Sequence, residues 1–336
     1  MRIDVPHLTQ ALQSGDRRAL ARAITLVESG RDDHRDLALK LLAGLDPARQ
    51  ALRIGLSGTP GVGKSTFIET FGLMLTARGL RVAVLAVDPS SARSGGSILG
   101  DKTRMEMLSR DARAFIRPSP SQTHLGGVAR RTRDAVRLCE AAGYDIVLIE
   151  TVGVGQSETV VAQMADLFVL LLAPAGGDEL QGVKRGIMEM ADLILVNKAD
   201  GDLKSAAQRT CADYAGALRL LRHRPQDMDG YPLAMTVSAL DAVGLELAWD
   251  RMRTLADWRA AQGIAAGTRA DQARHWFRHD LRAEMMALLT RDPALAARLA
   301  TLENAVAAGS LSPAAAARAA LAPLTVTPQA TAAVVP

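Results

Sequence analysis

The stretch that decides the fold is Gly58-Thr59-Pro60-Gly61-Val62-Gly63-Lys64-Ser65. It fits the pattern G-x-x-x-x-G-K-[ST], in which backbone N–H groups of a glycine-rich loop and a helix N-terminus converge on phosphate oxygens. The apolar run 52–57 before it is typical of a strand, and 65–77 after it is typical of a helix. Lys64 would place a positive charge at the β and γ phosphates, and Ser65 a hydroxyl at Mg²⁺. A plain glycine-rich turn is the alternative, and the strand and helix on either side disfavour it.

Short apolar runs alternate with helical patterns over the middle of the chain. This alternation is the signature of strands joined by helical crossovers, and therefore of a mostly parallel sheet. We predict an α/β P-loop fold with a mostly parallel sheet flanked by helices. The predicted strands are Leu52–Ser57, Val82–Val87, Ala114–Arg117, Ile146–Glu150, Leu167–Leu172, Leu193–Asn197 and Leu233–Val237.

The ends of the chain have helical spacing instead of strand patterns. Two or three short amphipathic helices fit residues 7–45, and helices near 243–262, 265–290 and 292–308 follow the last strand. The C-terminal helices would pack on the sheet domain or on a second copy of the chain. The last stretch, rich in Ala, Pro and Thr, has no core-forming pattern, and we predict that it is mobile. The predicted parts are an N-terminal extension 1–48, a P-loop domain 49–241, a C-terminal helical region 242–308 and a tail 309–336.

Composition sets limits on the class of protein. The chain has 336 residues, of which 48% are hydrophobic and 23% are charged, with both signs well represented; this excludes a wholly disordered chain, a fibre or a disulfide scaffold. The net charge of +4 and the 3% of aromatic residues do not indicate a nucleic-acid partner. Cys139 and Cys211 stand in no metal-ligand pattern and are predicted to be two buried thiols. The N-terminus carries an acid early and lacks a signal-peptide run. The most apolar run, 167–173, is far shorter than the roughly 20 residues of a membrane-spanning helix. We expect a cytoplasmic protein without a membrane partner.

Base recognition is predicted from Asn197-Lys198-Ala199-Asp200, which directly follows an apolar run. The carboxylate of Asp200 could accept from both N–H groups on the guanine edge, which adenine does not offer. Asn197 could reach the O6/N7 edge, and the stem of Lys198 could cover the ring. Ser238-Ala239-Leu240, after the last predicted strand, resembles the loop that supports guanine in GTPases. Asn, Lys and Asp are also common turn residues, and that is the alternative interpretation.

Carboxylates stand where a Mg²⁺ site would need them. Asp88 and Glu150 each end a predicted strand, at the sheet edge where ligands of open α/β sheets bind. Asp101 lies in a glycine-rich stretch, 94–104, suited to ordering around metal and phosphate. The alternatives are a helix cap for Asp88 and a solvated strand end for Glu150. With Ser65, these three acids form the predicted metal set.

Two groups of basic residues have a less specific pattern. Arg130-Arg131-Thr132-Arg133 contains no aromatic residue and is typical of a solvated helix face, which argues against nucleic-acid binding. Lys184 and Arg185, taken from the residues alone, favour a surface pair on a helix.

Taken together, these motifs resemble those of the MeaB/MMAA family of GTPases, also known as ArgK or LAO/AO transport ATPases. The resemblance rests on residues 20–29, Gly58–Thr66, Val87-Asp88-Pro89-Ser90-Ser91, Gly96–Arg104, Glu150–Glu158, Gly177–Lys184 and Asn197–Asp200. It implies a GTP-hydrolysing chaperone of an adenosylcobalamin-dependent acyl-CoA mutase, usually methylmalonyl-CoA mutase. The implied ligands are GTP or GDP with Mg²⁺, and the implied assembly is a homodimer through the C-terminal helices.

The resemblance also implies roles for individual residues. The loop Gly58, Thr59, Pro60, Gly61, Val62, Gly63, Lys64, Ser65 and Thr66 would bind the phosphates, and Asp88 and Asp101 would be the metal-linked acids. Glu150 would open the second switch. Asp178, Gln181 and Lys184 would match the third switch, which reverses the surface interpretation of Lys184. Lys64, Glu150, Gln156 and Lys184 are the predicted catalytic residues, with Gln156 and Glu150 as alternatives for orienting the attacking water.

Three other functions remain as alternatives. A metal-insertion GTPase should carry a His-rich tract or paired Cys and His near the switches, and the six histidines are scattered. A kinase acting on a transport protein should prefer ATP, against which Asn197–Asp200 argues. An assembly module would bind nucleotide without functional hydrolysis.

Overall fold

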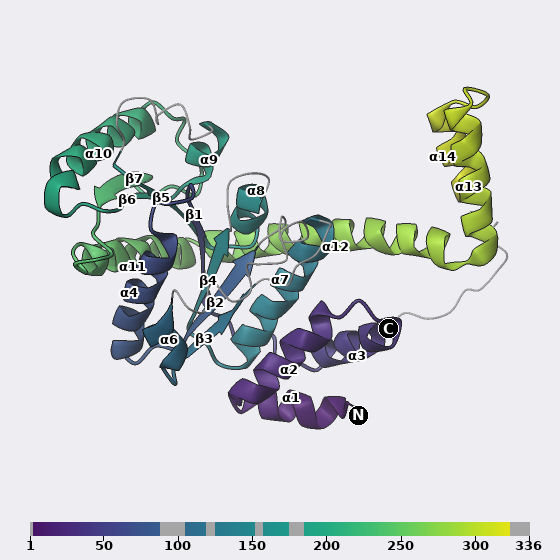
Figure 1. The fold of residues 1–336 in the computed structure, drawn as a ribbon, viewed down its shortest axis with the longest axis horizontal. Helices are drawn as coiled ribbons and strands as arrows, with labels where there is room; N and C mark the ends of the chain where they lie inside the picture. The colour runs from purple at the N-terminus through teal and green to yellow at the C-terminus, as the bar shows by residue number, and fades with distance from the viewer. Residues whose placement is uncertain (1–2, 88–104, 119–124, 152–156, 175–184, 323–336) are drawn as a thin grey trace. The chain divides into compact units, whose positions relative to one another are not determined.

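The computed structural model of the protein describes residues 3–87, 105–118, 125–151, 157–174 and 185–322. The chain divides into two compact units, residues 1–272 and residues 273–336. The first unit holds a seven-stranded sheet and most of the helices, and the second is entirely helical where it is described (Figure 1).

The sheet is parallel throughout. Its strand order is β3-β2-β4-β1-β5-β6-β7, and every neighbouring pair runs in the same direction. This confirms the predicted fold class, a mostly parallel sheet with helical crossovers. The strands are β1 (Leu52–Ser57), β2 (Val82–Val87), β3 (Ala114–Arg117), β4 (Ile146–Thr151), β5 (Leu167–Leu172), β6 (Leu193–Val196) and β7 (Leu233–Thr236).

Helices cover both faces of the sheet. Ile54 and Leu56 of β1 belong to the core shared with α4 (Lys64–Ala77) and α11 (Leu245–Ala261). Gly55, between them, points to the other face, where a Cβ would lie 2.8 Å from Val161 of α8 (Ser157–Ala162). Because successive residues of a strand face opposite sides, β1 is packed on both. Figure 1 shows α4 and α11 on one side and α7 (Leu125–Ala141) and α8 on the other.

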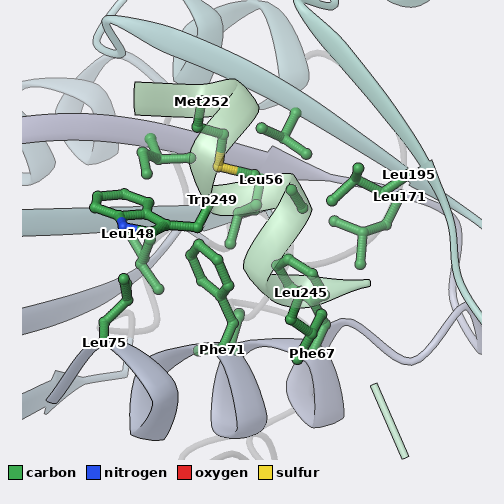
Figure 2. Packing of buried hydrophobic residues seen from close by; sticks show 14 of the residues in the cluster. Leu56, Phe67, Phe71, Leu75, Leu148, Leu171, Leu195, Leu245, Trp249 and Met252 are labelled. Carbon is green, nitrogen blue, oxygen red and sulfur yellow. The ribbon is translucent and has the colours of Figure 1, made fainter. Parts of the chain in front are cut away.

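A stripe of aromatic residues fixes α4 against α11. Phe67 and Phe71, one helical turn apart on α4, are fully buried with their ring centroids 5.1 Å apart. The ring of Phe71 meets the edge of Trp249 on α11 at 6.1 Å. Figure 2 shows these side chains meeting over Leu56 and Leu148 of the sheet. The helix that begins at Lys64 is therefore held by the main core.

The N-terminal extension forms three helices, as the spacing predicted. They are α1 (Val5–Gln13), α2 (Arg17–Glu28) and α3 (Asp32–Ala43). The Asp16 carboxylate caps α2 by accepting from the N–H groups of Arg18 at 2.6 Å and Ala19 at 3.0 Å. Leu20 and Ile24 of α2 are fully buried, and α2 packs on α7.

The remaining crossover elements of the first unit are short, except for helix α10 (Lys204–Arg219). The short elements are α6 (Glu106–Arg110), α9 (Arg185–Met190) and the 3₁₀ turn η2 (Gly201–Leu203). The first turns of α12 (Ile264–Arg291) also belong to this unit, and the rest of α12 belongs to the second.

The second unit contains a helix that the sequence analysis did not predict. After α12, α13 (Pro293–Ala307) follows as expected, and α14 (Pro313–Leu321) then packs on α13 within the stretch predicted to be mobile. The Ser312 hydroxyl accepts from the N–H of Ala315, and Pro313 occupies the first turn. Alanine has the highest helix propensity, so a capped alanine run forms a helix without a strong apolar stripe.

The two cysteines differ in burial. Cys139 is fully buried, which confirms its prediction, whereas Cys211 is only partly buried and corrects the other half of that prediction. Cys211 stands on α10, where exposed residues alternate with buried ones such as Ala207 and Tyr214. None of the helices in the described parts of the chain combines the length and apolarity needed to cross a membrane.

Candidate functional site

The loop 58–63 and the start of α4 form the phosphate side of the candidate site. A Cβ on Gly58 would lie 2.4 Å from the Leu171 carbonyl oxygen, so only glycine fits where the loop leaves β1. Gly63 has φ +89°, and its own Cβ would lie 2.7 Å from Nδ2 of Asn197. Helix α4 begins at Lys64, which leaves the N–H groups of its first turn without helical acceptors. This arrangement suits an anion.

Lys64 lies over the loop with its charge partly withdrawn from water. Its Nζ donates to the carbonyl oxygens of Gly58 at 2.5 Å and Thr59 at 3.3 Å. Burial lowers the pKa of the Lys64 ammonium below its ordinary value, while the charges of Glu150 and Glu158 raise it. A cation with reduced hydration interacts more strongly with an incoming anion than one in bulk water.

Glu150 is not the solvated strand end of the alternative interpretation. It is 4% exposed near the end of β4, in register with Leu56 of β1 and Ala86 of β2. The next residue, Thr151, donates its hydroxyl to Ser57 Oγ at 3.1 Å, which ties the ends of β4 and β1 together. The carboxyl ends of these two strands therefore lie together beside the phosphate loop.

Glu158 is a buried acid to which the sequence analysis gave no role. It is 1% exposed in the first turn of α8, and its charge acts on Lys64. A signal was present: an acid followed the glycine-rich stretch at the start of a short helix. Because such acids are usually solvated N-terminal caps, the pattern alone did not distinguish this one.

Asn197 connects the phosphate loop to the 238–240 loop. Its Nδ2 donates to the Val62 carbonyl at 2.9 Å, and its Oδ1 accepts from the Ala239 N–H at 3.0 Å. The residue is 2% exposed. The predicted contact of Asn197 with the base stays a prediction, and the structure adds two protein partners that the sequence did not indicate. One amide hydrogen and one lone pair remain for further bonds.

Asp200, the acid predicted to bind the edge of guanine, is oriented by the 238–240 loop. Ser238 donates its hydroxyl to Asp200 Oδ2 and accepts from the Asp241 N–H at 3.0 Å. Lys198 adopts a left-handed conformation, φ +58°, between the end of β6 and Asp200. Leu240 is 76% exposed. The pairs Asn197–Ala239 and Asp200–Ser238 thus join residues 197–200 to the 238–240 loop, and Asn197 also contacts the phosphate loop at Val62.

Six residues with predicted roles lie outside the described residues: Asp88, Asp101, Gln156, Asp178, Gln181 and Lys184. Of the predicted metal set, Ser65 and Glu150 are described. Within the ranges that the structure covers, no three His, Cys, Asp or Glu side chains come close enough together to hold a metal ion. The oxygen-only chemistry of the set, one hydroxyl and three carboxylates, fits Mg²⁺.

A cavity of about 650 Å³ lies elsewhere in the first unit. It is lined by the amino-terminal parts of β1 and β4, including Leu52 and Ile146, and by α11 and the start of α12. Parallel α/β sheets bind ligands at the opposite, carboxyl edge. Since the phosphate loop and Asp200 both lie at the carboxyl edge, we locate the candidate site there.

Comparison with known proteins gives one family. Residues 20–294 match the family described as methylmalonyl Co-A mutase-associated GTPase MeaB. A Caulobacter vibrioides protein is 54% identical over 316 residues, 94% of this chain and 96% of its own. The mouse protein named methylmalonic aciduria type A homolog, mitochondrial, is 49% identical over 320 residues, 92% of this chain and 77% of its own.

A solved structure agrees with the sequence relatives. A crystal structure of an LAO/AO transport system kinase superposes with a TM-score of 0.73 and 37% identity, and covers 97% of this chain and all of its own. These matches span the strands, the phosphate loop and the Asn197–Asp200 stretch, and they confirm the resemblance on which the sequence analysis relied.

Proposed function

Because the chain belongs to the MeaB family of methylmalonyl-CoA mutase-associated GTPases, we propose that it is a GTP-hydrolysing chaperone of an adenosylcobalamin-dependent acyl-CoA mutase. Methylmalonyl-CoA mutase is the first partner to test. In this role the nucleotide state gates loading of the cofactor into the mutase and protects or reactivates the mutase. The mouse relative is named after methylmalonic aciduria, which supports methylmalonyl-CoA mutase as the partner. A cytoplasmic location is part of the proposal.

The observation that carries the nucleotide part is the pair of hydrogen bonds made by Asn197. They join the phosphate loop, at Val62, to the loop that orients Asp200, at Ala239. A guanine nucleotide bound here would reach both loops at once, with phosphates at Gly58–Thr66 and the base at Asp200. Lys198 would cover the ring, and Ser238, Ala239 and Leu240 would support it.

Hydrolysis at this site would rest on positioning and charge. A water attacks the γ-phosphorus, the bond to the β-γ bridging oxygen breaks, and GDP and inorganic phosphate leave. Lys64 and the N-terminus of α4 neutralise charge on the phosphates. Ser65, Asp88, Asp101 and Glu150 would hold Mg²⁺, which would supply further charge neutralisation when bound. Glu150 or Gln156 orients the water, and Lys184 responds to the mutase.

Base specificity is tested by Asp200→Asn with GTP and XTP. The wild-type protein should prefer GTP, because the carboxylate accepts from the two guanine N–H groups. An amide offers a donor that suits the extra oxygen of xanthine, so the variant should prefer XTP. A variant that keeps its preference for GTP contradicts this role of Asp200. Equal binding of ATP and GTP by the wild type would favour the kinase alternative.

Coupling to the mutase is tested by GTP turnover. Hydrolysis should be slow alone and faster when the mutase is added, because binding of the partner would favour the reactive arrangement of the site. A pull-down with the purified mutase, with GDP or GTP present, tests the complex itself. Equal turnover with and without every adenosylcobalamin-dependent mutase tried, and no complex, would contradict the chaperone role and leave nucleotide binding intact.

A homodimer through the second unit is proposed from an apolar stripe on α12. Four large apolar side chains are 39–66% exposed at a spacing of four, four and three residues, which places them on one helix face: Phe277, Leu281, Met285 and Leu288. A stripe of this kind is typical of an association surface. The variant Leu281→Asp should become monomeric by light scattering, whereas Arg282→Glu, one position off the stripe, should not. A monomeric wild type contradicts the proposal.

A further inference from the structure

Thr70 links the helix that begins at the phosphate loop to the loop that orients the base-edge acid. Its Oγ1 donates to the Ala239 carbonyl oxygen at 2.8 Å. Thr70 stands on α4, six residues after Lys64, which is about 9 Å along the helix axis. The contact therefore spans from the phosphate side of the site to its base side, through a rigid element.

The peptide groups around Ala239 are held on two sides. The N–H of Ala239 donates to Asn197 Oδ1, and its carbonyl accepts from Thr70. The residue is 2% exposed, so water does not readily replace either bond. Loss of the Thr70 hydroxyl would leave a buried carbonyl without this donor and release one side of the loop.

The rest of the 238–243 loop is braced against itself. Ser238 and Val243 exchange backbone hydrogen bonds of 2.9 and 3.1 Å, and Asp241 donates to the Ser238 hydroxyl. The loop then continues into α11, whose Leu245 and Trp249 pack against Phe67 and Phe71 of α4 (Figure 2). A loop braced in this way moves as a unit, so its position relative to α4 depends on the Thr70 contact and on this packing.

We propose that Thr70 is a positioning residue for guanine recognition, which sets where Ser238 and Asp200 stand relative to the phosphate-binding turn of α4. The inference rests on the proposed guanine site. It predicts an effect on the base and none on the phosphates, because Lys64 and the loop 58–63 do not contact the Thr70 hydroxyl.

The test compares Thr70→Val, which keeps the shape and removes the hydroxyl, with Thr70→Ser, which keeps the hydroxyl. Thr254→Val is the matched control, since the Thr254 hydroxyl only donates to Asp250 of its own helix, at 2.8 Å, on the surface. Binding of GDP and of ADP is measured by displacement of a fluorescent GDP, well below the unfolding midpoint of every variant. GTP turnover is measured at saturation.

Thr70→Val should lose about tenfold in GDP affinity and keep the ADP affinity and the saturated turnover rate of the wild type. Thr70→Ser and Thr254→Val should behave like the wild type. An unchanged GDP affinity in Thr70→Val, or an equal loss for GDP and ADP, overturns the inference alone. A wild-type protein that binds GDP and ADP equally overturns the proposed guanine specificity as well.

Discussion

Arg269 holds Asp166 by two parallel hydrogen bonds, from Nε to Oδ1 at 2.8 Å and from Nη2 to Oδ2 at 2.6 Å. The two side chains are only 18% and 12% exposed. The same carboxylate accepts from the Arg53 N–H at 2.9 Å, and the same guanidinium donates to the Ala51 carbonyl. This pair therefore ties the first turns of α12 to the amino ends of β1 and β5.

Breaking that pair should be strongly destabilising. Arg269→Met leaves the Asp166 carboxylate buried without its cation, and we expect a loss of about 3–5 kcal/mol in the free energy of unfolding. The control is Arg31→Met, because Arg31 and Asp33 form an exposed pair, 69% and 61% exposed, expected to contribute below about 1 kcal/mol. Urea titration of both variants checks this. Equal losses in the two variants would mean that the buried pair contributes no more to the free energy of unfolding than the exposed pair.

The contact between α4 and α11 should also carry much of the stability. Phe71 is fully buried against Phe67 and Trp249, so Phe71→Ala opens a cavity and should cost about 3–5 kcal/mol. Leu220→Ala, at a residue that is 88% exposed, should stay within about 0.5 kcal/mol of the wild type. Thermal unfolding followed by circular dichroism gives both values. A small loss for Phe71→Ala would show that the core refills the space.

The strands could be predicted from the sequence almost to the residue. A strand in the middle of a parallel sheet is buried on both faces, so Leu167–Leu172 is a continuous apolar run, and Pro174 follows two residues after it. Helix α14 was missed because its signal is propensity and capping at Ser312, without an apolar stripe. Periodicity detects burial, and a helix of small residues has little side chain to bury.

The site could be predicted in part, because motif residues mark their own chemistry. The sequence indicated Lys64, Asn197 and Asp200, but it did not indicate the two protein contacts that Asn197 makes with Val62 and Ala239. Thr70 gave no signal, since a threonine within a helix looks the same whether or not its hydroxyl reaches another loop. Contacts between distant segments depend on how α4 and α11 pack, which spacing alone does not contain.

Thiol reactivity should separate the two cysteines. Burial, together with the charge of Glu140, raises the pKa of the Cys139 thiol far above its ordinary value, and burial alone raises that of the half-buried Cys211. Because the thiolate is the reactive form, Cys211 should react first with iodoacetamide at pH 8, and Cys139 only when the protein unfolds. Mass spectrometry of timed samples identifies the labelled residue, and Cys211→Ser should abolish the early phase. Early labelling of Cys139 contradicts its burial.

A methyl group on Gly63 should disturb the site in a way that backbone strain alone does not. Gly63 and Gly79 have nearly the same left-handed conformation, φ +89° and +86°, but a Cβ on Gly79 meets nothing within 4 Å. Gly79→Ala should therefore cost about 1 kcal/mol of stability and leave GDP affinity unchanged. Gly63→Ala would place a Cβ 2.7 Å from Nδ2 of Asn197, so either this side chain or the loop must shift, which would strain the Asn197 bond to Val62. We expect a larger loss of stability and weaker GDP binding, measured by unfolding and by displacement of labelled GDP. If the two variants bind GDP equally, the Asn197 bond to the phosphate loop does not contribute to nucleotide binding.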